Sequence, residues 1–346
     1  MLSLIWFVLI LGAIVTVHEF GHFIFAKLSN TYVYEFSIGM GKKIFGKKKK
    51  DSETEFCIRA VPLGGYVMIA GEDVEDEEVP KDRQMCNKGF FARFIILFAG
   101  AFFNFIFAFL VLFVSALIWG AVSTKPFIGD VSPEYPAYTA GLEKGDLVLS
   151  INGEKISNWD RGLVMLQTTD GDAVVFEVQK TDGTVVEYTV EPILVKDEEG
   201  NESYKFGIAT AYEKEYGFGK SLKYACNKTI SLLGSMWDTI KYLFNGKVGV
   251  NQLSGPVGIF TIVDSQAEQG LEALLYLVAY LSINVGLINL LPFPAFDGGR
   301  TLFLFIEKIF RKPVSKKVEN IIHTIGFFLI IGLLIFVTFN DILRLF

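Results

Sequence analysis

The chain has 346 residues, of which 51% are hydrophobic and 33 are phenylalanine, a composition too apolar for an ordinary soluble domain. Its 32 basic and 38 acidic residues give a net charge of -6, which leaves no basic excess for binding nucleic acid. The three cysteines, Cys57, Cys86 and Cys226, are far apart and form no CxxC pair, so neither a disulfide framework nor a thiolate zinc site is indicated.

Four long segments are almost free of charged residues: 2–26, 94–119, 273–296 and 321–340. A hydrocarbon layer of ~30 Å needs ~20 helical residues, and each segment reaches that length. The first segment has no basic residue before it and contains two histidines and a glutamate, which argues against a cleaved signal peptide. The sequence therefore predicts transmembrane helices over 1–27, 94–120, 271–296 and 321–340.

Lysine and arginine gather on one side of these predicted spans. They are frequent in the loop 28–93 and in the segment 297–320, whereas the first residues of the chain carry none. Because basic loops stay in the cytoplasm, we expect both termini and the long segment after the second span to lie outside the cell.

The external segment is predicted to contain a small domain over 126–212. Val174, Phe176 and Val178 alternate along one strand, which Asp182-Gly183 turns back into a second strand. Further strand and helix patterns occupy 146–151 and 159–166. After this domain, residues 213–270 are predicted to form an amphipathic helix and a linker.

The sharpest chemical signal is HEFGH at residues 18–22, inside the first span. On a helix, His18 and His22 lie one above the other and can bind one metal ion, with Glu19 beside it. Catalytic zinc prefers such nitrogen ligands and keeps one position open for water, from which the glutamate can take a proton. The pattern favours zinc-protease chemistry.

Two alternatives apply to these histidines. A buried histidine is more often hydrogen-bonded than metal-bound, and HExxH strings arise by chance. Against this, each ionisable group inside a span costs roughly 2.5 kcal/mol or more, and here three occur within five residues. The remaining histidine, His323, stands alone in the fourth span and is interpreted as a neutral, packed or interfacial residue.

A two-histidine site needs another protein ligand, and Asp297 at the cytoplasmic end of the third span fits best. Its carboxylate and one hydroxide would neutralise Zn²⁺ inside the hydrocarbon. The alternative is that Asp297 only caps a helix beginning near Gly298, and the residues alone leave both interpretations open.

Two further segments are unusual. Asn284, Asn289, Pro292 and Pro294 interrupt the third span, so its helix is expected to break there. In the cytoplasmic loop, two short strand-like runs surround Gly64-Gly65 and predict a hairpin over about 55–70. This hairpin either dips into the membrane or lies on the surface as a plain loop.

The motifs together resemble the site-2 protease family, in its bacterial RseP/RasP-type form with one PDZ domain. The resemblance rests on HEFGH, RAVPLGGYVMIAGED, KGFFARFIILFAGAFFN, LSGPVGI and NLLPFPAFDGGR, in this order along residues 18–300. One departure is visible, since the family's AGP reads Ala99-Gly100-Ala101 here, while Asn104 is retained.

The resemblance implies an α-helical integral membrane protein with four transmembrane helices, a membrane-associated β-hairpin and an inserted extracytoplasmic PDZ domain (α+β). It implies an intramembrane zinc endopeptidase with His18, His22 and Asp297 as Zn²⁺ ligands and Glu19 as the catalytic acid and base. The implied substrates are single-span membrane proteins, such as anti-sigma factors or remnant signal peptides, cut near the cytoplasmic face of the cell membrane after a first external cleavage. The implied substrate-binding residues are Asn284, Asn289, Pro292, Pro294, Gly64 and Gly65.

Two other classes of function compete with this interpretation. A membrane metal transporter also places histidines and an aspartate in its spans, but it needs neither a glutamate after the first histidine nor an external domain. A non-catalytic scaffold for membrane segments would not need the intact HExxH and Asp297.

Overall fold

The computed structural model describes residues 2–50, 52–72, 77–169, 171–196, 202–210, 214–249 and 253–344. The chain divides into two compact units, Met1–Val111 with Asn251–Phe346, and Leu112–Val250. Parts of the predicted external domain, at 170, 197–201 and 211–212, lie outside the described residues.

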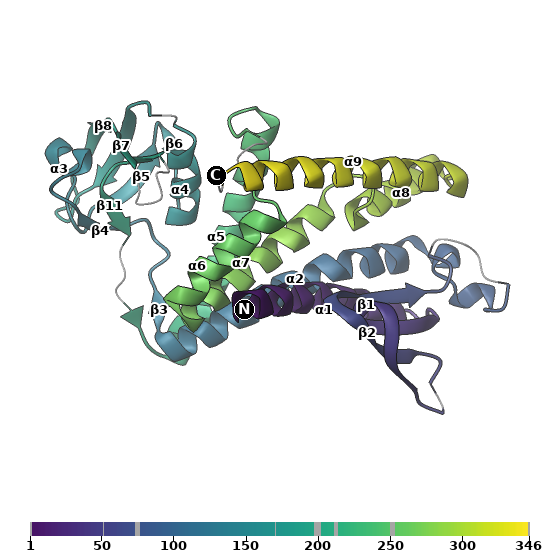
Figure 1. The fold of residues 1–346 in the computed structure, drawn as a ribbon. Helices are drawn as coiled ribbons and strands as arrows, with labels where there is room; N and C mark the ends of the chain where they lie inside the picture. Colours follow the sequence, from purple (N-terminus) through teal and green to yellow (C-terminus); the bar gives the residue numbers. More distant parts are fainter. Residues whose placement is uncertain are drawn as a thin grey trace. The chain divides into compact units, whose positions relative to one another are not determined.

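Helices make up most of the first unit (Figure 1). They are α1 (Leu2–Leu28), α2 (Phe90–Trp119), which continues into the second unit, α6 (Pro256–Gln269), α7 (Leu271–Leu290), α8 (Asp297–Phe310) and α9 (Lys316–Leu343), with two short 3₁₀ helices, Lys81–Arg83 and Met85–Asn87. In the described part of the chain, α1, α2, α7 and α9 are long and apolar enough to cross a membrane.

Helix α1 is the centre of this unit, because it contacts elements from both ends of the chain. Ile10 and Ile14 pack against Val263 of α6 and against Leu274 and Leu277 of α7. On another side, the α-carbon of Gly21 lies so close to the carbonyl oxygen of Ala99 in α2 that no side chain would fit. Small residues permit such close approach of membrane helices.

Strands β1 (Val33–Lys48) and β2 (Glu55–Ile69) follow α1 and lie beside it (Figure 1). Residues 33–38 of β1 pair with 65–69 on one side and with 55–58 on the other, while 43–48 pair with 55–59. The predicted hairpin within 55–70 is therefore wrong: its two halves flank residues 33–38 instead of pairing with each other. The local pattern around Gly64-Gly65 carries no information about a partner segment that lies 20 to 36 residues earlier in the chain.

The third predicted span breaks at Pro292 and Pro294, but not at Asn284 and Asn289, which lie within a continuous helix. Helix α7 ends at Leu290 and α8 begins at Asp297, with an irregular segment between them. Helix α6 was not expected, since residues 256–269 were assigned to a linker. Its N-terminus is capped by Asp341 of α9, whose Oδ2 accepts hydrogen bonds from the amides of Gly255 and Gly258 at 2.9 and 2.8 Å.

The second unit contains a four-stranded sheet in the order β6-β5-β7-β8, and its described residues also form helices and shorter strand pairs. Its elements are β3 (Ala121–Val122), β4 (Ile128–Val131), α3 (Pro136–Ala140), β5 (Leu147–Ile151), β6 (Glu154–Lys155), α4 (Trp159–Gln167), β7 (Val174–Gln179), β8 (Val185–Val190), β9 (Ile193–Lys196), β10 (Glu202–Lys205), β11 (Ile208–Thr210), β12 (Lys214–Glu215) and α5 (Phe218–Phe244).

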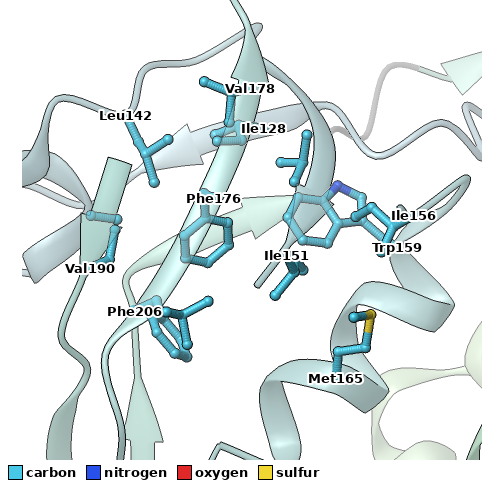
Figure 2. Packing of buried hydrophobic residues seen from close by; sticks show 13 residues of the cluster. Ile128, Leu142, Ile151, Ile156, Trp159, Met165, Phe176, Val178, Val190 and Phe206 are labelled. Carbon is cyan, nitrogen blue, oxygen red and sulfur yellow. The ribbon is translucent and has the colours of Figure 1, made fainter. Parts of the chain in front are cut away.

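Alternate side chains of β7 point into the hydrophobic core of this unit. Val174, Phe176 and Val178 are fully buried, and Val178 pairs with Val186 across the predicted hairpin, which is confirmed. Figure 2 shows Phe176 at the centre of this core, with Trp159 of α4 nearby. Helix α5, predicted as an amphipathic helix, is joined to α4 by ion pairs, Lys228 with Asp160 at 2.7 Å and Asp238 with Arg161.

Candidate active site

Three donor atoms from two distant parts of the chain meet in the first unit. His18 and His22 lie one turn apart on α1, and their Nε2 atoms are 3.1 Å from each other. Oδ2 of Asp297 lies 3.0 Å from Nε2 of His18 and 3.3 Å from Nε2 of His22. Both histidines are buried.

Asp297 does not cap its own helix. Phe296 occupies the N-cap position of α8, and no side chain caps this terminus. The carboxylate of Asp297 is directed at the two imidazoles instead. Of the two interpretations left open by the residues alone, the structure rules out the N-cap and retains the position beside the histidines.

The Nδ1 atoms of both imidazole rings contact α2. Nδ1 of His22 lies 2.8 Å from the carbonyl oxygen of Ile96, which can only accept a hydrogen bond. Nδ1 of His22 therefore donates its hydrogen to this carbonyl, and Nε2 is the ring nitrogen that faces Asp297. Nδ1 of His18 lies 3.4 Å from the side-chain amide of Asn104.

The donor set fits a zinc ion. Ligands at ~2.0 Å in a tetrahedral arrangement lie about 3.3 Å from one another, close to the three observed separations of 3.0 to 3.3 Å. A methyl group added at Gly100 would lie 2.7 Å from Nε2 of His18 and within contact distance of His22, so glycine keeps the space beside the donors open. Two imidazoles and one carboxylate are also ligands that zinc favours.

A second cluster of potential ligands, Glu35, Glu55 and Cys57, occurs in the described part of the chain. Its carboxylates already have partners, because Arg59 pairs with Glu35 at 2.8 Å and Lys43 pairs with Glu55 at 2.7 Å. This cluster therefore does not compete with the histidine site.

Glu19 lies at the same cavity as the three donors. The cavity has a volume of about 300 Å³, and His18, Glu19, His22 and Asp297 all line it. One carboxylate oxygen of Glu19 accepts a hydrogen bond from the amide of Val67 in β2 at 3.2 Å. Strand β2 thus holds the carboxylate without consuming its second oxygen.

Of the residues expected to bind substrate, only some lie at the cavity. Asn289 lines the cavity, whereas Asn284, Pro292 and Pro294 are not among its described lining residues. Gly64 and Gly65 pack against the turn of α1 before His18: the carbonyl oxygen of Gly64 accepts a hydrogen bond from the hydroxyl of Thr16 at 3.3 Å.

One contact near the site could not be predicted from the sequence. Nδ1 of His323, in α9, accepts a hydrogen bond at 2.9 Å from the amide of Ala295, two residues before Asp297. Ala295 has φ +79, a left-handed conformation that a non-glycine residue rarely adopts. Gly326, one turn further along α9, lets the helix pack directly against the backbone of Pro294. His323 is thus packed, as expected, but against the segment that carries Asp297.

The chain belongs to peptidase family M50, whose sequence model matches residues 6–333, and it is a multi-pass intramembrane zinc metalloprotease of the site-2 protease type. It is similar to the regulator of sigma-W protease RasP of Bacillus subtilis, with 32% identity over 99% of each chain. A Clostridium perfringens protein described as a zinc metalloprotease is 36% identical over 98% of each chain.

A comparison of structures matched the PDZ domain of the SdrC-like protein of Listeria monocytogenes. This match has 20% sequence identity and a TM-score of 0.21, and it covers 25% of this chain and 88% of that domain.

Proposed function

We propose that His18, His22 and Asp297 bind the catalytic zinc ion and that Glu19 is the catalytic acid and base. The proposal is supported by the separations among the three donor atoms and by the open space that Gly100 leaves beside them. When bound, zinc polarises the carbonyl of the scissile peptide bond and makes a water molecule more acidic.

Glu19 moves the proton in this proposal. Its carboxylate takes a proton from the water that attacks the carbonyl carbon and later delivers this proton to the nitrogen of the leaving amine. The hydrogen bond from Val67 fixes one carboxylate oxygen, so the other oxygen is available at the cavity that the zinc ligands line. The single observation that carries the proposal is the convergence of His18, His22 and Asp297 beside Glu19.

The substrate is a single-span membrane protein that is cut within its membrane segment. A helix hides its peptide bonds, since each carbonyl is hydrogen-bonded and surrounded by side chains, so the substrate must unwind near the site. Residues 65–69 form an outer segment of the β1-β2 sheet and include Val67, which contacts Glu19. An extended substrate that paired along such an edge would keep its backbone hydrogen-bonded inside the bilayer.

The segment between α7 and α8, with Pro292, Pro294 and the neighbouring Asn284 and Asn289, would hold the unwound substrate on the other side. Asn289 supports this role best, because it lines the cavity. Gly64 and Gly65 support it indirectly by letting β2 approach α1 closely.

The second unit contains a PDZ domain that lies outside the cell and excludes substrates whose external portions are intact. The basic residues of loop 28–93 and segment 297–320 support a catalytic site near the cytoplasmic face in this topology. An earlier extracytoplasmic cut would therefore precede the intramembrane cut. Deleting residues 126–212 should allow uncut substrates to be cleaved; if a folded deletion variant still rejects them, the filter is refuted.

Replacing Glu19 with Gln tests the catalytic proposal directly. The variant, reconstituted in liposomes with a truncated single-span substrate, should bind zinc like the parent but lose cleavage, because an amide cannot accept the proton. Glu268→Gln, on the exposed surface of α6, is the matched control and should cleave like the parent. Undiminished cleavage by the Glu19 variant would refute the assigned role.

A further inference from the structure

Helix α2 presents three successive positions to the histidine pair, at Ile96, Gly100 and Asn104. Positions four apart lie on one face of a helix, so these residues form a single row. The first position offers a carbonyl oxygen to His22, the second leaves open space, and the third places a side-chain amide against His18. Only Asn104 contacts a histidine through its side chain, so a substitution there can change this contact without altering the backbone.

Asn104 is completely buried, with 0% of its surface exposed. As placed, its Nδ2 atom faces Nδ1 of His18 at 3.4 Å, and its Oδ1 atom has no hydrogen-bond partner. A buried polar atom without a partner costs about 1–3 kcal/mol, and exchanging the two ends of the amide would put Nδ2 in this position instead of Oδ1. The two ends of an asparagine amide have nearly the same shape, so their assignment follows from the hydrogen bonds that each orientation makes.

The two orientations have opposite consequences for the metal site. If Nδ2 faces His18, it donates to Nδ1, so the proton of the neutral ring must reside on Nε2. That proton would point at the other donors and close Nε2 to a metal. If Oδ1 faces His18, Nδ1 carries the proton and donates it to the amide, which leaves the lone pair of Nε2 directed at the site.

We propose that Asn104 is a positioning residue for His18: its Oδ1 atom accepts the Nδ1 proton of the ring and thereby directs the lone pair of Nε2 to the zinc site. The same arrangement already exists for His22, where the Ile96 carbonyl accepts the Nδ1 proton at 2.8 Å. Both rings thus use an oxygen acceptor on α2, and hydrogen bonds of this kind orient metal-binding histidines. This inference rests on the proposed function of the histidine site.

Asn104 is itself held by the third membrane helix. The hydroxyl of Ser282 in α7 donates a hydrogen bond to the backbone carbonyl of Asn104 at 2.9 Å, and Ser282 is fully buried. Ser282 contacts the backbone and not the amide group. It therefore provides a matched control that perturbs the same contact region without changing the partner of His18.

The test measures zinc affinity of the purified full chain in detergent, by competition with a chromophoric chelator, for Asn104→Ala, Asn104→Asp and Ser282→Ala. Removal of an outer hydrogen-bond partner should weaken zinc binding by Asn104→Ala roughly 10- to 100-fold. Asn104→Asp retains an oxygen acceptor and should bind zinc at least as tightly as the parent. Ser282→Ala should also bind like the parent. Thermal unfolding of the metal-free proteins reports whether each variant is folded.

The outcomes separate this inference from the function on which it rests. If the parent binds no zinc, the proposed function fails and the inference fails with it. If the parent binds zinc and folded Asn104→Ala binds equally tightly, only the role of Asn104 is overturned. Should Asn104→Ala fail to fold, Asn104→Asp decides alone: retained affinity supports an oxygen facing His18, and lost affinity in a folded protein supports the nitrogen and overturns the proposal.

Discussion

The α-carbon of Gly100 lies against Nε2 of His22, with no room for a side chain between helix α2 and the imidazole. A methyl group at this position would project among the donor atoms, 2.7 Å from Nε2 of His18. Glycine in the middle of a helix normally lowers its stability by about 1 kcal/mol relative to alanine. Here the glycine instead leaves space beside the donor atoms of the proposed zinc site.

Gly100→Ala should therefore abolish zinc binding although it removes no ligand. The expected result is a folded chain whose zinc content, measured by elemental analysis after purification, falls close to zero. Gly332→Ala is the matched control, because Gly332 lies in α9 with nothing within 4 Å of the added methyl group. Full zinc content in a folded Gly100→Ala variant would contradict the location of the site.

His323 should influence catalysis through the segment that carries Asp297. His323→Ala removes the acceptor for the Ala295 amide, so the left-handed turn before Asp297 loses its restraint. The loss of a residue that supports a metal ligand lowers activity about 10-fold or more. His323→Asn can replace the acceptor with its amide oxygen and should recover most of the cleavage rate. The measurement is the initial rate on a reconstituted substrate, and equal rates for His323→Ala and the parent would disprove the restraint.

Arg59 should stabilise the strand that holds Glu19. Its guanidinium binds both carboxylate oxygens of the buried Glu35, and Tyr66, adjacent to Val67, donates a hydrogen bond to the same carboxylate at 2.9 Å. Arg59→Met leaves this carboxylate without its cation, which destabilises the sheet because Glu35 is largely shielded from water. Backbone amides in residues 33–69 should then exchange hydrogen faster.

Lys43→Met provides the comparison for Arg59→Met. Lys43 pairs with Glu55 in the same sheet, but this pair is exposed, and exposed ion pairs contribute little because water and salt screen them. Its exchange rates should remain close to those of the parent. If both variants exchange alike, the Arg59 pair does not support the strand.

Much of the site could be predicted from the sequence, because its chemistry is local. HEFGH specifies two imidazoles and a carboxylate on one helix without reference to the rest of the chain. Asp297 could be proposed from its place at the end of a span, but only the fold shows its carboxylate beside the two imidazoles and Phe296 at the N-cap. Strand β7 could also be predicted from the sequence, because its alternating residues and the Asp182-Gly183 turn define the register of the hairpin by themselves.

The remaining features depend on contacts between distant residues. The double pairing of residues 33–38 with both halves of β2 leaves no local pattern, so the hairpin was predicted in the wrong place. Asn104 and Gly100 read as packing residues of an apolar helix until His18 and His22 are placed beside them. Helix α6 carries too weak an apolar pattern to be recognised alone, and its N-terminus depends on Asp341, more than eighty residues later.

The most direct test of the account is the zinc content and zinc X-ray absorption spectrum of the purified full chain. The account predicts about one zinc per chain, bound by two imidazole nitrogens and one carboxylate oxygen at ~2.0 Å, with the oxygen contribution lost or altered in Asp297→Asn. No zinc in folded protein, or a bound zinc whose spectrum lacks imidazole and is unchanged in Asp297→Asn, would contradict it.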